Sequence, residues 1–238
     1  LQNEWKNDRW GILIGGRLDK HNMVDNVIFS PRANLRFNPT QNINLRLSYS
    51  SGFRAPQAFD EDMHIENVGG TVAMIERAKN LKEEKSQSFS ASADMYHRFG
   101  VFQTNFLIEG FYTRLTDVFV LGEPYDRGDG ILVKTRSNGP GAKVMGLTLE
   151  GKVAYLSILQ IQAGLTLQRS RYDEPHKWHD DAPAEKKIFR TPDTYGYFTA
   201  TYTPIKPLSI ALSGTYTGRM LVQRMDITAE NAELGAMP

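Results

Sequence analysis

The chain lacks the features that mark several common protein classes. Its 238 residues include no cysteine, which excludes a disulfide scaffold and a thiolate metal site. No apolar run approaches the roughly 18 residues that a membrane-spanning helix needs, and the mean hydropathy is −0.42. The formal net charge is only +1, and the charges are spread along the chain, so the sequence does not predict nucleic-acid binding.

What the chain does have is a strict alternation of apolar and polar residues. It is clearest over residues 43–50, where the apolar set is Ile43, Leu45, Leu47 and Tyr49 and the polar set is Asn44, Arg46, Ser48 and Ser50. Successive side chains of a strand point to opposite faces, so this pattern separates an apolar face from a polar one. The pattern persists over segments of about ten residues or more, the length that a tilted strand needs to cross a bilayer.

The alternation predicts about nine strands and an all-β fold. We expect an antiparallel up-and-down transmembrane β-barrel segment with long extracellular loops. Low hydropathy does not conflict with this fold, because every second residue of such a barrel faces a polar lumen. The expected strands are 9–19, 27–37, 43–53, 83–96, 102–120, 131–155, 159–171, 189–203 and 208–222.

The connections between these segments alternate between short and long. Short turns are expected at 38–42, 97–101, 156–158 and 204–207, and long polar loops at 20–26, 54–82, 121–130 and 172–188. This asymmetry is typical of periplasmic turns opposed to extracellular loops. A soluble β-sandwich is the alternative, but its strands usually run about five or six residues, roughly half the length seen here.

Short motifs in a fixed order resemble the barrel region of TonB-dependent outer-membrane receptors. The segment 31–53 ends in Gly-Phe and is followed by Arg-Ala-Pro at 54–56, an order that in this family commonly opens a large extracellular loop. Further matches lie at 80–86, 111–117, 137–139, 146–150, 190–192 and 216–220. Each match is short, but together they cover nearly the whole chain.

The resemblance implies a receptor that captures a scarce ligand, such as a ferric siderophore or cobalamin, and imports it with energy delivered by the TonB complex through a plug domain. It also implies the outer membrane of a Gram-negative bacterium, with the bilayer and lipopolysaccharide as surroundings and a metal chelate as ligand. The sequence shows neither a plug nor a final aromatic-ended strand. We therefore expect residues 1–238 to be a partial barrel domain, about nine strands of a 22-stranded barrel.

The loop 54–82 holds the first group of candidate ligand contacts. By the resemblance such loops fold over the mouth of the barrel, with Arg54 at the strand exit and Asp60, Asp62 and His64 within the loop. A short helix is expected around residues 72–79. The simpler interpretation of these acidic residues is that they keep the loop soluble.

The loop 172–181 holds the second group. Trp178 is a candidate ligand contact, and His176 and His179 are three residues apart, which could place both on one side of a turn for Zn²⁺ or Cu²⁺. A solvated loop explains the same residues, since no tight metal-ligand motif is present.

The sequence does not predict an enzyme or a bound cofactor. Barrel enzymes need a nucleophile held beside a histidine and an orienting group, yet all five histidines are expected in loops or turns. Two other functions stay open: a surface-exposed β-rich binding or adhesion module that never enters a membrane, and a passive porin.

Overall fold

The computed structural model describes residues 1–22, 24, 26–56, 73–122, 125–128, 132–177, 183–225 and 232–237, and these contain strands and no helix. Accordingly, no helix in the described ranges is long and apolar enough to cross a membrane. The strands are β1 (Gln2–Lys6), β2 (Trp10–Asp19), β3 (Ile28–Thr40), β4 (Ile43–Arg54), β5 (Ala73–Arg77), β6 (Glu84–Phe99), β7 (Phe102–Thr116), β8 (Phe119–Leu121), β9 (Tyr125–Asp126), β10 (Leu132–Asn138), β11 (Ala142–Tyr155), β12 (Leu159–His176), β13 (Glu185–Lys187), β14 (Thr194–Ile205), β15 (Leu208–Thr217), β16 (Met220–Met225) and β17 (Ala232–Met237).

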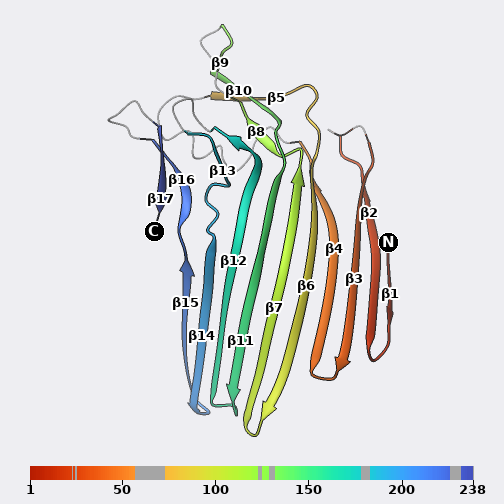
Figure 1. Cartoon of the computed structure of the whole chain (residues 1–238), viewed down its shortest axis with the longest axis vertical. Coiled ribbons are helices and arrows are strands. Elements are labelled where there is room, and N and C mark those ends of the chain that lie inside the picture. The colour runs from red at the N-terminus through yellow and green to blue at the C-terminus, as the bar shows by residue number, and fades with distance from the viewer. Residues whose placement is uncertain are drawn as a thin grey trace.

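One large antiparallel sheet dominates the molecule (Figure 1). Its strand order is β1-β2-β3-β4-β6-β7-β11-β12-β14-β15, and β13 pairs with the upper part of β12. Each long strand therefore lies beside the next long strand in the chain, which is the predicted up-and-down order. The nine predicted strands correspond to β2, β3, β4, β6, β7, β11, β12, β14 and β15.

The register gives the sheet one apolar and one polar face. Ala93, Ile108, Leu149 and Leu165 are direct cross-strand partners on one face. The adjacent row on the other face is Ser92, Glu109, Thr148 and Thr166. Polar-face side chains also hydrogen-bond across strands, as in the 3.0 Å contacts between the hydroxyls of Ser88 and Thr113 and of Thr148 and Thr166. The alternation in the sequence is thus a true division of faces.

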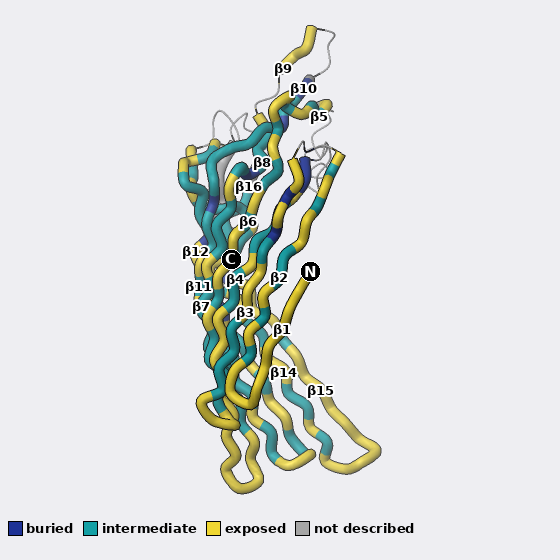
Figure 2. Tube along the Cα trace, turned by 90° about the vertical axis from the view of Figure 1, so that its right-hand side faces the viewer, coloured by how far each residue is buried: buried dark blue, intermediate teal, exposed yellow. Residues whose placement is uncertain are grey.

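Among the residues that the structure describes, the sheet has no ordinary hydrophobic core. In the described part of the chain, the buried apolar residues are Val24, Ile28, Ala55, Val118, Val133 and Ala142, all at the end of the sheet that carries the long connections. Along the strands exposed and half-buried residues alternate (Figure 2). Large apolar side chains on the apolar face stay open, with Leu47 56% and Leu212 63% exposed. A continuous open apolar face of this kind is typical of a surface that lipid covers.

The two ends of the sheet differ as predicted. Short connections join β3 to β4, β6 to β7, β11 to β12 and β14 to β15 at one end. The long connections gather at the other end, where β5, β8, β9 and β10 stand above the sheet (Figure 1).

One local prediction is wrong, and one strand was missed. The segment expected to form a short helix around residues 72–79 contains strand β5, because its backbone pairs in parallel with β10 and this tertiary pairing overrides local propensity. No strand was predicted before residue 9, yet residues 2–6 form β1, which pairs with β2 through backbone bonds that need no apolar side chains.

Three predicted strands each divide into two strands, and a fourth begins later than predicted. Residues 102–120 divide into β7 and β8 at Asp117, whose φ of 54° ends the extended run. Residues 131–155 divide into β10 and β11 at Gly139-Pro140-Gly141, and residues 208–222 divide at Gly218-Arg219 into β15 and β16. The strand predicted at 189–203 begins only at Thr194. In all three divided strands the upper part leaves the wall and joins a separate, smaller sheet: β8 and β10 pair with each other, and β16 pairs with β17.

Candidate functional site

Two long connections combine into one small sheet above the wall, which we call the cap sheet (β5, β8, β9 and β10). Strand β5 comes from the β4–β6 connection, whereas β8, β9 and β10 come from the β7–β11 connection. β5 and β10 run parallel from Ala73 opposite Leu132 to Arg77 opposite Arg136. Parallel strands cannot be joined by a hairpin, and here the whole β6–β7 hairpin separates them. The two connections are therefore held together as one unit.

Backbone and side-chain contacts stabilise the cap sheet. Val133 on β10 is completely buried. The N–H of Ala78 donates to the carbonyl of Arg136 at 2.8 Å, which extends the β5–β10 pairing by one residue. Arg127, after β9, forms a 3.1 Å ion pair with Glu76 on β5. The last two contacts each join a residue of the β4–β6 connection to a residue of the β7–β11 connection.

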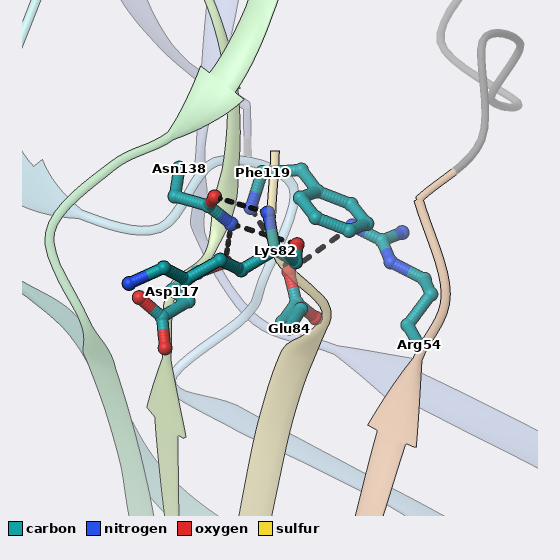
Figure 3. Close-up of polar contacts among 6 residues, drawn as sticks. All are labelled: Arg54, Lys82, Glu84, Asp117, Phe119 and Asn138. Atoms are coloured by element: carbon teal, nitrogen blue, oxygen red, sulfur yellow. Dashed lines mark hydrogen bonds and ion pairs between the residues drawn. The ribbon is translucent and has the colours of Figure 1, made fainter. Parts of the chain in front are cut away.

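Where the cap sheet meets the wall lies a cluster that we call the rim clasp, formed by Arg54, Lys82, Glu84, Asp117, Phe119 and Asn138 (Figure 3). Asn138 is its centre. Its side-chain amide donates to the carbonyls of Lys82 at 3.0 Å and Asp117 at 2.8 Å, and its Oδ1 accepts from the N–H of Lys82 at 2.8 Å. One side chain thus joins Lys82, where the β4–β6 connection returns to the wall, to Asp117, where the β7–β11 connection leaves it.

Arg54 and Glu84 form the polar-face part of the rim clasp. They are direct cross-strand partners at the ends of β4 and β6, on the same face as Ser88 and Ser92. The guanidinium of Arg54 donates to Glu84 Oε2 at 3.2 Å, and the same oxygen accepts from the N–H of Phe119 at 3.1 Å. The Arg54 guanidinium also lies 4.9 Å from the centre of the Phe119 ring, within cation–π range. The side chain of Arg54 is still 43% exposed.

The neighbouring carboxyl of Glu83 is held in its charged form. Burial opposes ionisation, but hydrogen bonds from its own backbone N–H and from Lys85, together with the charges of Lys85 and Lys82, lower the pKa of Glu83 below its ordinary value. The Lys85 amine lies 3.0 Å from the carboxylate. At the strand entry, residues 82–85, two carboxylates are therefore flanked by two lysines.

The structure places the predicted site residues unevenly. Arg54 lies in the rim clasp, and His176 ends β12 with its ring 5.9 Å from that of Tyr172. Asp60, Asp62, His64, Trp178 and His179 lie outside the described residues. The expectation that every histidine lies in a loop or turn is wrong, since His97 lies within β6 and His176 within β12. Among the described residues, no group of three or more His, Asp or Glu side chains could hold a metal ion.

Sequence reasoning did not assign a role to Asn138 or Glu84. The signal for Asn138 was its position before Gly139-Pro140-Gly141, which breaks the strand. At such a break a side-chain amide can hydrogen-bond backbone groups that have no partner in the sheet. Glu84 was visible only as part of a charged run, and its pairing with Arg54 depends on the β4–β6 register.

The chain belongs to the TonB-dependent receptor-like β-barrel family, whose model matches residues 1–232. This family is found in the outer membrane of Gram-negative bacteria, and its members are transport receptors rather than enzymes. No protein with a curated description matches the chain.

Solved receptors share the fold. The chain resembles the FrpB iron transporter of Neisseria meningitidis, with 16% identity, a TM-score of 0.64, and coverage of 92% of this chain and 32% of that one. The siderophore receptor PirA of Pseudomonas aeruginosa is 17% identical with a TM-score of 0.65, and the match covers 90% of this chain and 39% of PirA. A mutant of the ferric enterobactin receptor PfeA of Pseudomonas aeruginosa is 17% identical with a TM-score of 0.66, and the match covers 97% of this chain and 34% of that receptor. The chain thus spans about a third of the length of these receptors.

Proposed function

We propose that this chain forms part of the wall and the ligand-capture end of an outer-membrane receptor that imports a ferric chelate of the siderophore type with TonB-derived energy. The observation that carries the proposal is the cap sheet, which joins two long connections over the polar-face rim of a family-typical barrel wall. Two neighbours in structure are a siderophore receptor and an iron transporter, which favours a ferric chelate over cobalamin.

The geometry suggests how capture works. A ligand arriving from outside first meets the cap sheet and the residues around it, and then the polar face at Arg54. A half-exposed guanidinium beside an aromatic ring suits an anionic, aromatic chelate, because the cation attracts carboxylate or catecholate oxygens and the ring offers a stacking surface. Arg54, Asp60, Asp62, His64 and Trp178 remain our proposed ligand contacts, and His176 with His179 a proposed weak metal site.

The other parts of the proposal concern the surroundings. The apolar face lies against the bilayer and lipopolysaccharide of the outer membrane, and the polar face lines the lumen. Residues 1–238 form a partial barrel domain, and the rest of the receptor provides a plug that the TonB complex rearranges. In this arrangement the chain itself holds no cofactor.

The test is uptake of radiolabelled iron by cells of the source bacterium under iron limitation. Cells that carry the gene should take up a ferric siderophore, and deletion of the gene or dissipation of the proton gradient should abolish this uptake. Uptake that persists after dissipation of the gradient would indicate a passive porin. Clean extraction of the native protein without detergent would indicate a surface binding or adhesion module.

A further inference from the structure

Three arginines lie at mid-height on the polar face of β3 and β4. Arg36 is the direct cross-strand partner of Arg46, and Arg32 lies four positions from Arg36 on the same face of β3, towards the rim. We call Arg32, Arg36 and Arg46 the arginine column. Four residues span about 13 Å along a strand. Arg54 lies on the same face of β4, nearer the rim, so the column continues downwards from the rim clasp.

The residues that the structure describes do not neutralise the charges of the arginine column. Within the described ranges no ion pair involves the column, although like charges that face each other directly, as in Arg36 and Arg46, destabilise a sheet. Uncharged groups hold two of the side chains: Arg32 donates to the side chain of Gln2, and Arg46 Nε donates to Asn44 Oδ1 at 2.8 Å. Among the described residues, the buried Nε of Arg36 has no hydrogen-bond partner. The column therefore keeps an uncompensated positive charge.

Glycines of β2 allow two of these side chains to lie along the wall. Gly11 is the direct partner of Arg36, and Gly15 is the direct partner of Arg32. A Cβ added at Gly11 would lie 3.3 Å from Nε of Arg36, and a Cβ added at Gly15 would lie 3.3 Å from Nε of Arg32. Both side chains thus cross β2 in close contact with its backbone. The cations are held at the wall, and their charge acts on whatever occupies the space in front of it.

Carboxylates occupy the neighbouring part of the same face. The row of Arg46 continues through Ser92 on β6 to Glu109 on β7, and Asp94 and Glu150 lie in the next row towards the short turns. At mid-height the polar face is therefore basic on β3 and β4 and acidic on β6, β7 and β11. A surface lined by one sign of charge concentrates ions of the opposite sign. An anion in front of this face is drawn to the arginine column and repelled from the carboxylates.

We propose that the arginine column is the path along which an anionic ferric chelate descends through the lumen after it leaves Arg54. Passage through a pore needs several binding sites in series, each strong enough to attract the solute and weak enough to release it. Cations spaced along the wall and held there by uncharged partners meet this condition. The path therefore favours chelates of net negative charge over neutral ones. This inference rests on the proposed function, because it requires the polar face to line the lumen of an importer.

The plug is the other possible occupant of this space. Arginines that anchor a plug would extend towards it, whereas Arg32 and Arg36 lie across the glycines of β2. A fixed plug would also bring carboxylates to neutralise the column permanently, and the column would then be closed to a chelate. The two occupants thus differ in whether a reagent from solution reaches the column during import.

The experiment measures charge preference at a reporter thiol in the whole receptor, with the reporter as its only cysteine, in iron-limited cells of the source bacterium. Ser48→Cys places the thiol on the polar face of β4, two positions from Arg46 and opposite Asn34. The thiol is reacted with a methanethiosulfonate that carries either a sulfonate or a trimethylammonium group. During import the sulfonate reagent should react about 10-fold faster, the lower end of the range for a cleft lined by one sign of charge.

Replacement of the arginine column should abolish this preference. Arg32→Gln with Arg36→Gln and Arg46→Gln removes the three charges, so the two reagents should react at equal rates. The corresponding Arg→Lys variant keeps the charges and should keep the preference, which leaves the test decisive if the glutamine variant fails to fold. The matched control reporter is Thr148→Cys, opposite Glu109. It should prefer the trimethylammonium reagent with or without the arginine column.

Transport is measured in the same cells with radiolabelled ferric enterobactin, an anionic chelate. The glutamine variant should bind the chelate on ice as tightly as the wild type, because the column acts after capture. It should import the chelate about 10-fold more slowly, because the attraction that draws the anion along the wall is lost.

Three results would overturn the inference. The first is equal reaction of the two reagents at residue 48 of the wild type, and the second is a preference that survives the glutamine replacement. The third is no reaction at residue 48 during import, since the plug would then cover the column throughout. A wild type that shows the expected preference but imports no chelate contradicts only the proposed function. Import with labelling that is independent of charge contradicts only this path.

Discussion

Two arginine-bearing clusters lie at the same end of the sheet but on opposite faces, and their pairing differs. In the rim clasp on the polar face, Arg54 has a carboxylate directly opposite it and an aromatic ring beside it. On the apolar face, Arg114, Lys143, Arg169 and Arg171 form a group of cations on β7, β11 and β12 that we call the basic row, and in it Arg171 has a lysine directly opposite it. In the first cluster the residue directly opposite the arginine carries the opposite charge, whereas in the second it carries the same charge.

The difference shows that position along a strand does not by itself determine the role of a charged residue. Register decides which residues become neighbours, and the face decides the solvent that surrounds them. At the polar rim, water and the carboxylate share the charge of Arg54, so the pair is weak and adaptable. At the lipid interface, an unpaired cation is favourable only beside anionic headgroups.

The largest effect is expected from a charge on the apolar face at mid-height. Leu149→Arg should cost about 2–4 kcal/mol of unfolding free energy, because it places a cation in the hydrocarbon. Glu150→Arg puts the same side chain on the polar face and should cost within about 1 kcal/mol. Urea unfolding of the whole receptor in lipid vesicles measures both. Equal costs would contradict the division into two faces.

The next effect is expected at the centre of the rim clasp. Asn138→Ala removes three hydrogen bonds to the backbone of Lys82 and Asp117. It should lower the free energy of unfolding by about 1–2 kcal/mol, and proteases should cut the two long connections faster. Asn138→Asp keeps the acceptor for Lys82 and should have an intermediate effect. If proteolysis of both variants matched the wild type, the clasp would not hold the connections.

A smaller effect is expected from the Arg54–Glu84 pair. Arg54→Ala should cost about 0.5–1 kcal/mol, discounted because the side chain is 43% exposed. A double-mutant cycle with Glu84→Gln isolates the pairwise term. The coupling should be small, whereas chelate affinity should fall clearly in Arg54→Ala. Unchanged affinity would remove Arg54 from the proposed ligand contacts.

The smallest effect concerns pH. The folded-state pKa of Glu83 is lowered, so its stabilisation is present above the ordinary value of 4.5 and is lost as the pH falls through the lower, folded-state pKa. Glu83→Gln should therefore flatten the acid side of the stability profile below pH 4.5 and leave neutral pH nearly unchanged. An unaltered acid limb in thermal unfolding would show that Glu83 contributes nothing there.

The strands of the wall were well predicted, because period-two alternation is visible within each strand. Pairing between neighbouring strands then only has to align their apolar faces. The loop end was predicted less well. β5 depends on a parallel partner some sixty positions away, and its residues Ala73–Arg77 show no alternation strong enough to exclude a helix. The division at Asp117 depends on one residue with positive φ, which composition does not reveal.

The site residues show the same contrast between local signals, which the sequence reveals, and distant pairings, which it does not. Arg54 was found through a motif, but its partner Glu84 required the β4–β6 register. The basic row was invisible in the sequence, because its four cations come from three strands and only the β7–β11–β12 pairing places them side by side.

The most direct test of the account is nitroxide scanning along β11 of the whole receptor in outer-membrane lipid. The chain has no cysteine, so labels at residues 147 to 152 introduce the only thiols of this segment. The account predicts a period of two: labels at 147, 149 and 151 contact oxygen dissolved in the bilayer, and labels at 148, 150 and 152 contact a water-soluble nickel chelate. Uniform accessibility to the nickel chelate at all six positions would contradict a wall that separates lipid from a polar lumen.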